Sequence, residues 1–321
     1  MINKTTLLTH IFNEEYILPF WLNHHKNMFD EIIIIDYNST DKSIEICKNI
    51  CPDCKIIKTR NAAFDAIDTD KEMMDIENNI EGIKIILNTT EFLFCETNVK
   101  ECFGDTTEAK SLSINALSPY SNNNYEVNSN IELFSNLLND DVVFHNDRGK
   151  RQIHNFPNGN YTPGRHDTNN PKSDTDKFHI IWFGYYPMNE QLIKRKLQIQ
   201  QNMSQKDKDS RVFGAHHIID KDTIINVNKD RSTTGVSLQI INKKLYDIIK
   251  FIVEGSNENI KEGFMNNNSF YTKLINICIL ILFLLILFLI NTLIHKNNKI
   301  LYSLILIFLL IIIIKYNNVK Y

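Results

Sequence analysis

Residues 7–41 read LLTHIFNEEYILPFWLNHHKNMFDEIIIIDYNSTD, and this stretch decides the fold. One apolar run ends at Asn13-Glu14-Glu15, an amphipathic segment covers residues 16–29, and a second apolar run, residues 32–35, stops at Asp36. Both runs are short, rich in β-branched residues and apolar on both faces, which is typical of central parallel strands covered by helices. The stretch therefore predicts a strand, a helix and a second strand.

Polar side chains follow each predicted strand. The first strand leads into Asn13 and Glu14, and the second into Asp36 and the corner Asn38-Ser39-Thr40-Asp41. In an open parallel sheet, ligands bind beyond the carboxyl ends of the strands, where the strand order reverses. Asp36 can accept hydrogen bonds from a base or a ribose, and the corner offers N–H donors at a helix start. We therefore expect a nucleotide at this edge.

The same alternation continues to residue 92. The pattern predicts helices over residues 43–49 and 71–80 and strands over residues 54–59 and 83–87, the last ending in Asn88-Thr89-Thr90-Glu91-Phe92. Repeated strand–helix units of this kind indicate a doubly wound α/β half that binds a nucleotide.

The second half of the chain has a weaker pattern. Residues 95–141 are polar and rich in Asn, and they predict an irregular insertion or a partly disordered lid with one helix over residues 130–138. Residues 148–166 mix turn residues with cations, Arg148 and Arg151 among them, and predict a loop that suits contacts with a diphosphate or with sugar hydroxyls; the alternative is a plain surface loop. Residues 178–185 predict a buried strand, and residues 189–201 a helix bearing Lys194, Arg195 and Lys196.

The C-terminal region differs in composition from the rest. Residues 274–294 carry no charge and would span about 31 Å as a helix, and residues 300–316 would span about 25 Å. We predict an antiparallel pair of membrane helices over residues 273–316, after a linker over residues 256–272 and before a short tail, residues 317–321. The domain over residues 1–255 would carry the function.

Charge and cysteine content narrow the class of protein. The net charge is −3 and no basic block stands out, so we expect no nucleic-acid partner. No secretory signal opens the chain, the six cysteines show no disulfide framework, and lysines flank the predicted membrane pair on the domain side, which favours a cytosolic domain. Cys47, Cys51 and Cys54 lack a fourth zinc ligand at the usual spacing.

Three segments together carry a resemblance to a known family. Residues 12–15 (FNEE), 36–41 (DYNSTD) and 87–92 (LNTTEF) resemble the family 2-like glycosyltransferases of GT-A fold, over roughly residues 5–217. The resemblance implies a mixed α/β sheet flanked by helices, and inverting transfer of a sugar from a nucleotide-sugar donor to a carbohydrate, lipid or protein acceptor. The residues that it suggests for the nucleotide sugar are Asn13, Glu14, Asp36, Asn38, Asp41 and Asn88.

The segment at residues 88–91 departs from that family pattern. Many relatives carry D-x-D carboxylates that hold a divalent metal on the donor diphosphate, whereas this chain has Asn88 and Thr90 and keeps only Glu91. Mg²⁺ and Mn²⁺ prefer anionic oxygens, so dependence on Mn or Mg is weakened. Three interpretations of Glu91 stay open: it is a metal ligand, the base for the acceptor, or a solvated turn residue. Asp68 is the reserve base, and Asp65, Asp68 and Glu72 are alternative metal ligands.

Cations late in the domain offer a substitute for metal. Arg165, Arg195 and His216 are our candidates for neutralising the leaving diphosphate, although a run of cations such as residues 194–196 is more often a solvated helix face. A second hypothesis is a catalytically inactive membrane protein that binds a nucleotide sugar or a glycan, since both D-x-D carboxylates are lost. The third is a membrane protein whose soluble domain binds nothing.

Overall fold

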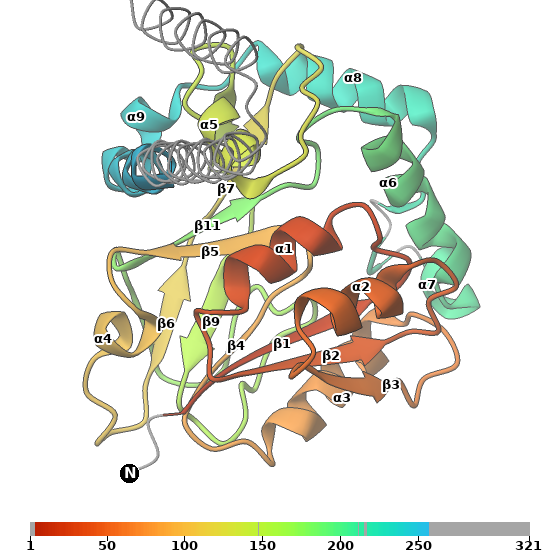
Figure 1. The fold of residues 1–321 in the computed structure, drawn as a ribbon. Coiled ribbons are helices and arrows are strands. Elements are labelled where there is room, and N and C mark those ends of the chain that lie inside the picture. The colour runs from red at the N-terminus through yellow and green to blue at the C-terminus, as the bar shows by residue number, and fades with distance from the viewer. Residues whose placement is uncertain (1–3, 147, 211, 215–216, 257–321) are drawn as a thin grey trace, which may run out of the picture. The chain divides into compact units, whose positions relative to one another are not determined.

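The computed structural model describes residues 4–146, 148–210, 212–214 and 217–256 of the chain. The chain separates into two compact units, residues 1–254 and 255–321, and the first contains two β-sheets with helices around them (Figure 1). The predicted membrane pair and tail lie outside the described residues, as does the predicted linker apart from Ser256. Within the described part of the chain, no helix has the length and apolar character needed to cross a membrane.

The described residues form eleven strands, seven in the larger sheet and four in the smaller one. The strands are β1 (Thr5–Ile11), β2 (Glu31–Asp36), β3 (Lys55–Lys58), β4 (Ile83–Ile86), β5 (Glu91–Cys95), β6 (Ser111–Ile114), β7 (Ala116–Tyr120), β8 (Val143–His145), β9 (Arg151–His154), β10 (Lys172–Asp174) and β11 (Phe178–Trp182). The helices are α1 (Leu18–His25), α2 (Ser43–Ile50), α3 (Ala66–Glu77), α4 (Val99–Phe103), α5 (Asn130–Asn136), α6 (Glu190–Asn202), α7 (Gln205–Ser210), α8 (Lys221–Ser232) and α9 (Leu238–Ile241).

The larger sheet confirms the predicted mixed α/β fold. Its order is β10-β6-β9-β4-β1-β2-β3, with β1 parallel to both β2 and β4, and β9 antiparallel to β4 and β6. Because β2 and β4 lie on opposite sides of β1, the strand order reverses at β1. The carboxyl ends of β1 and β4 therefore form the kind of edge at which ligands bind in such sheets.

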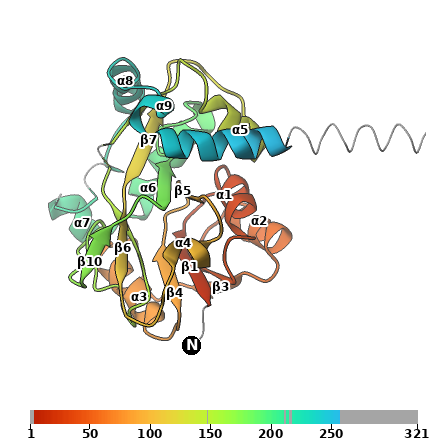
Figure 2. The ribbon, with the colours of Figure 1, turned by 90° about the vertical axis from the view of Figure 1, so that its left-hand side faces the viewer.

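Helices cover both faces of this sheet (Figure 2). Leu7 of β1 and Ile32 of β2 belong to the core that includes Trp21 of α1, whereas Leu8 and its neighbours pack with Met73 of α3. Side chains of a strand alternate between faces, so strands buried on both sides must be apolar throughout. This explains why residues 32–35 are four consecutive isoleucines.

The smaller sheet starts where the chain leaves the carboxyl end of β4. Its order is β5-β11-β7-β8. Polar side chains of α1 bind the backbone of β5: Trp21 Nε1 donates to Glu91 O (3.0 Å), His25 Nε2 accepts from Leu93 N (3.1 Å) and His24 Nε2 lies 2.6 Å from Leu93 O. Trp21 and the two histidines therefore fix the strand that begins with Glu91, and both histidines have a structural role.

Two predictions for the middle of the chain are wrong. Residues 95–141, expected to be irregular, contain α4, β6 and β7 besides the predicted helix, which appears as α5, and residues 151–154 form β9 rather than part of a loop. The sequence did not indicate these strands because they carry polar side chains. Those side chains are buried and hydrogen-bonded across the sheet: Ser111 and Ser113 both donate to Gln152 Oε1 (3.3 and 2.7 Å). Cys51 and Cys54 form a disulfide, and Cys47 is buried.

Candidate functional site

A cavity of about 370 Å³ opens at the carboxyl ends of β1 and β4. This volume lies in the range of small-molecule and cofactor sites. We call it the basic cavity, because among the described residues five cations and three carboxylates line it: Arg148, Arg151, Arg165, Arg195 and Lys196, with Glu14, Asp70 and Glu91. Cations outnumber carboxylates on this lining, which favours an anion as the ligand.

The first ion pair of the basic cavity joins Glu91 and Arg151. Arg151 Nε donates to Glu91 Oε2 (2.9 Å) and Arg151 Nη2 to Glu91 Oε1 (2.6 Å), and both side chains are about 95% buried. The backbone N–H of Asn88 also donates to Glu91 Oε2 (2.8 Å). Burial alone raises the pKa of Glu91, but the charge and hydrogen bonds of Arg151 outweigh it, so the pKa lies below its usual value. Glu91 is therefore ionised and a weak proton acceptor.

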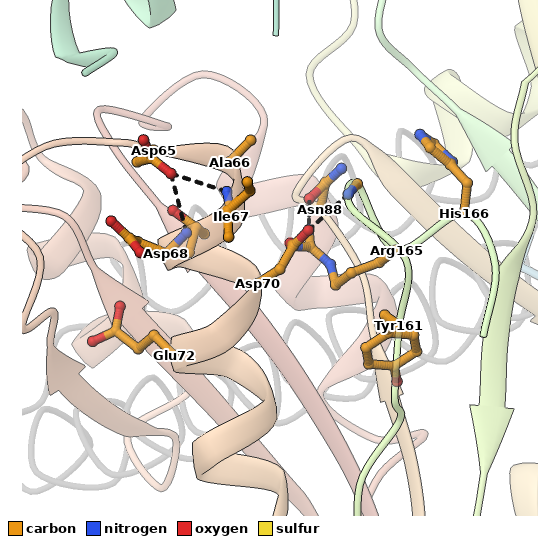
Figure 3. Close-up of polar contacts among 12 residues, drawn as sticks. Asp65, Ala66, Ile67, Asp68, Asp70, Glu72, Asn88, Tyr161, Arg165 and His166 are labelled. Atoms are coloured by element: carbon orange, nitrogen blue, oxygen red, sulfur yellow. Dashed lines mark hydrogen bonds and ion pairs between the residues drawn. The ribbon is translucent and has the colours of Figure 1, made fainter. Parts of the chain in front are cut away.

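The second ion pair comes from a loop and from α3 (Figure 3). Arg165 Nη1 donates to Asp70, Arg165 Nη2 donates to Asn88 Oδ1 (2.9 Å), and Gly164 N donates to the other oxygen of Asp70 (2.7 Å). Gly164 (φ 85°) and Arg165 (φ 59°) both have left-handed backbone, which turns the arginine inward and which glycine adopts without cost. Arg165 Nε is buried and has no hydrogen-bond partner within the described part of the chain, so its capacity to donate is unused.

The third ion pair separates the basic cavity from a second, larger one. Arg195 of α6 binds Glu14 through two hydrogen bonds (2.5 and 2.7 Å). Arg195 also lines the second cavity, of about 1040 Å³, together with Asn13 and Asp41. Glu14 and Arg195 both line the basic cavity, but they neutralise one another there.

Two further cations of the basic cavity lie against aromatic rings. Arg148 Cζ is 3.4 Å from the centroid of the Trp182 ring, and Lys196 Nζ is 3.7 Å from that of Tyr185. Ring faces attract cations without neutralising them. Burial, followed by the charges of Arg195 and Arg148, lowers the pKa of Lys196 to about 7.

Two histidines of the basic cavity, His10 and His166, are neutral at physiological pH. Burial, with the nearby arginines, lowers the pKa of His10 to about 3 and that of His166 to about 4. His166 Nδ1 lies 2.8 Å from Arg151 Nη1, and His10 Nδ1 is buried without a partner. Neutral imidazoles can hydrogen-bond a ligand but add no charge to the cavity.

The corner after β2 serves mainly to join two segments of backbone. Asn13 Oδ1 accepts from Thr40 N (2.7 Å), Asp41 accepts from the N–H of Glu15 (3.0 Å) and of Ser43 (2.9 Å), and Asp36 Oδ1 accepts from Ser39 N (2.9 Å). Asp36 and Asn38 line neither of the two cavities. Of the predicted binding residues, the basic cavity thus collects Glu14, Asn88, Arg165 and Arg195, and the second cavity collects Asn13, Asp41 and Arg195.

The acidic residues of α3 are placed differently from the prediction. Asp68, the reserve base, does not line the basic cavity and lies away from Asn88 and Arg165, whereas Asp70 faces both (Figure 3). Asp65 caps α3 through Ile67 N (3.1 Å) and Asp68 N (3.2 Å), and Glu72 accepts from Tyr37, Thr59 and Arg60. His216 lies outside the described residues.

The residues present do not fit a divalent cation. Among the residues that the structure describes, no three His, Cys, Asp or Glu side chains come together as metal ligands. Mn²⁺ and Mg²⁺ need several oxygen ligands, and the two carboxylates beside Asn88 already hold guanidinium groups, Glu91 that of Arg151 and Asp70 that of Arg165. We therefore assign no metal to this site.

Some residues of the basic cavity were not predicted as site residues. Asp70, Arg148, Arg151 and Trp182 all line it. Arg148 and Arg151 belong to the cationic stretch noted in the sequence, which was a usable signal. Asp70 is one of several acids in residues 65–77, and only the helical phase of α3 decides which of them faces the cavity.

A buried network supports the loop that carries Arg165. Glu77 accepts from Tyr161 Oη (3.0 Å) and Gly159 N (3.0 Å), and His154 Nε2 lies 3.1 Å from it. We expect Tyr161→Phe to lower the free energy of unfolding by about 1–3 kcal/mol, because the Tyr161 hydroxyl contacts both Glu77 Oε1 (3.0 Å) and His154 Nε2 (2.9 Å) and both buried contacts are lost. Urea unfolding measures this. Tyr246→Phe, at a partly exposed residue, should change it by a few tenths of a kcal/mol at most; equal effects would contradict the role of the network.

Comparisons with known proteins give a partial likeness in structure. No protein-family model and no curated protein matches the chain. The S. aureus TarS 1-349 structure has a TM-score of 0.30 and 19% identity, covering 39% of this chain and 38% of that one; TarS 1-349 is also known in complex with UDP-GlcNAc. The glucosyl-3-phosphoglycerate synthase of Mycobacterium tuberculosis, in complex with Mn²⁺, UDP and glucosyl-3-phosphoglycerate, has a TM-score of 0.24 and 12% identity, covering 28% of this chain and 35% of that one. The chain thus spans well under half the length of either protein.

Proposed function

We propose that this chain is a glycosyltransferase of GT-A-like fold, which moves a sugar from a nucleotide-sugar donor to an acceptor. The observation that carries the proposal is the basic cavity, which lies at the edge where β1 and β4 end and holds two more cations than carboxylates. A nucleotide sugar has a diphosphate whose charge must be neutralised as it leaves. Arg165 Nε, Arg148 and Lys196 lie on the walls where they would bind it.

The reaction would break the bond between the anomeric carbon and the diphosphate. An acceptor hydroxyl attacks that carbon, loses its proton to a base, and the nucleoside diphosphate leaves with the bonding electron pair. The three-segment resemblance supports inversion at the anomeric carbon. Glu91 would act by holding Arg151 rather than as the base, since both of its oxygens already accept hydrogen bonds.

One observation favours a second candidate function. Glu14, Asp70 and Glu91, the carboxylates of the basic cavity within the described residues, each pair with an arginine, so none is free to accept a proton. A protein that binds a nucleotide sugar without turning it over would have this arrangement. The predicted membrane pair, residues 273–316, would anchor either protein with its domain in the cytosol.

A donor screen separates these candidates. The full-length chain, purified in detergent, is titrated with UDP- and GDP-sugars by calorimetry, and release of nucleoside diphosphate is followed by chromatography. We expect at least one donor to bind at one molecule per chain and to be cleaved slowly, with water as the acceptor. Binding without cleavage of any donor would favour the second candidate, and no binding would contradict both.

A further inference from the structure

We infer that a guanidinium group takes the place of the divalent metal in this site, so that donor binding and transfer need no metal ion. This inference deepens the proposed function and rests on it for the identity of the donor. It starts from Arg151, which meets Glu91 with two parallel hydrogen bonds where both side chains are buried. Such a fork-to-fork contact is the strongest geometry that a carboxylate forms with a side-chain cation.

The hydrogen-bond capacity of Glu91 is fully used. Oε2 accepts from Arg151 Nε and from Asn88 N, and Oε1 accepts from Arg151 Nη2, with Asn88 Nδ2 at 3.4 Å. A metal ion could bind Glu91 only after Arg151 had left. Its departure would leave a buried guanidinium without its counter-ion, which is strongly unfavourable.

Arg151 is itself held in place by other groups. Its Nη1 contacts the carbonyl oxygens of Gly164 (3.2 Å) and Arg165 (3.3 Å) and lies 2.8 Å from His166 Nδ1. These contacts tie Arg151 to the loop that presents Arg165. Arg165 in turn bridges Asp70 and Asn88, the residue that stands where relatives have the first D-x-D carboxylate.

The charge of the cavity supplies what a metal would. A divalent ion would add positive charge to a site, and the basic cavity is lined by five cations against three carboxylates. Arg148 and Lys196, which lie on the rings of Trp182 and Tyr185, belong to this lining, and a bound anion would favour the charged form of Lys196. Asn88 and Thr90, in place of carboxylates, keep that excess from being cancelled.

The test uses inorganic pyrophosphate, UDP and Mn²⁺ on the full-length protein. Pyrophosphate and UDP are titrated by calorimetry in EDTA and in Mn²⁺, and free Mn²⁺ is followed by electron paramagnetic resonance. We expect both ligands to bind in EDTA, UDP affinities that agree within about twofold in the two conditions, and no Mn²⁺ bound beyond that held by the ligand alone. Binding that is tenfold tighter in Mn²⁺, stoichiometric uptake of Mn²⁺ by the complex, or no binding of pyrophosphate in EDTA would overturn the inference.

A variant gives a second, independent measurement. In Asn88→Asp/Arg151→Gln the guanidinium is removed and a carboxylate restored, so Mn²⁺ should now bind at least tenfold more tightly than to the unaltered protein. Asn88→Asp alone is the matched control and should gain little, because Arg151 remains on Glu91. Equal gains in both variants would also count against the inference. If the double variant does not fold by circular dichroism, the wild-type titrations still decide.

The titrations also separate this inference from the proposed function. Binding of pyrophosphate without metal, and without preference for any nucleotide sugar, would leave the inference standing and refute the proposed function.

Discussion

Replacing Arg151 by methionine is expected to lower the free energy of unfolding by about 3–5 kcal/mol. The reason is that Glu91, about 95% buried, would keep its negative charge without a counter-ion. The double variant Glu91→Gln/Arg151→Met should recover much of the loss, because no uncompensated charge remains. Urea unfolding of the three proteins, read as midpoints at constant slope, measures both effects.

A matched ion pair on the surface provides the control for this prediction. Arg60 and Asp75 are 52% and 43% exposed, so Arg60→Met should cost under about 1 kcal/mol. If Arg151→Met costs no more than Arg60→Met, the pair with Glu91 is not the electrostatic anchor of the site. If the double variant is as unstable as the single one, lost packing rather than lost charge is responsible.

Replacing Lys196 by methionine is expected to weaken donor binding by about 1.5–3 kcal/mol, roughly 10- to 150-fold. Methionine fills similar space beside Trp182 and Tyr185, and Lys196 has no carboxylate partner among the described residues, so the fold should persist. Calorimetric titration with the preferred nucleotide sugar measures the loss. Lys194→Met is the control: Lys194 is exposed on α6 and lines only the second cavity, so the variant should bind the donor within about twofold of the unaltered protein, whereas a large loss would point to the second cavity as the donor site.

The same lysine predicts how donor binding depends on pH. Burial lowers the pKa of Lys196 to about 7, and a bound diphosphate would raise it, so binding takes up a proton above that pH. Donor affinity should therefore fall as the pH rises from 7 towards 9, by at most tenfold per unit. His10 and His166, with pKa values of about 3 and 4, do not titrate in this range. If the Lys196→Met variant keeps the same dependence of donor affinity on pH, the effect belongs to another group.

The N-terminal part of the fold, with β1 and β2, could be predicted because its sequence signal is local. The isoleucines at residues 32–35 indicate a strand buried on both faces, and β1 and β2 lie where the pattern placed them. Residues 151–154 gave no such signal, because RQIH is neither a run of apolar residues nor a regular alternation of apolar and polar ones. What makes this a buried strand is pairing with Ser111–Ile114 and Ile83–Ile86, which are distant in sequence.

The site could be predicted only in part, for a related reason. The sequence shows which residues are charged, and Glu14, Asn88, Glu91, Arg165 and Arg195 do line the basic cavity. It does not show which charges cancel. Glu91 pairs with Arg151, 60 positions away, and Glu14 with Arg195, 181 positions away. Residues that the sequence suggests as ligands of the donor therefore bind one another instead.

The direct test of this account is a structure of the full-length chain with a bound nucleotide sugar. We predict the diphosphate in the basic cavity, within hydrogen-bond distance of Arg165 Nε and Lys196 Nζ, with Arg151 still on Glu91. A nucleotide sugar found instead in the second cavity beside Asn13 and Asp41, or a diphosphate held through a metal ion on Glu91, would contradict it.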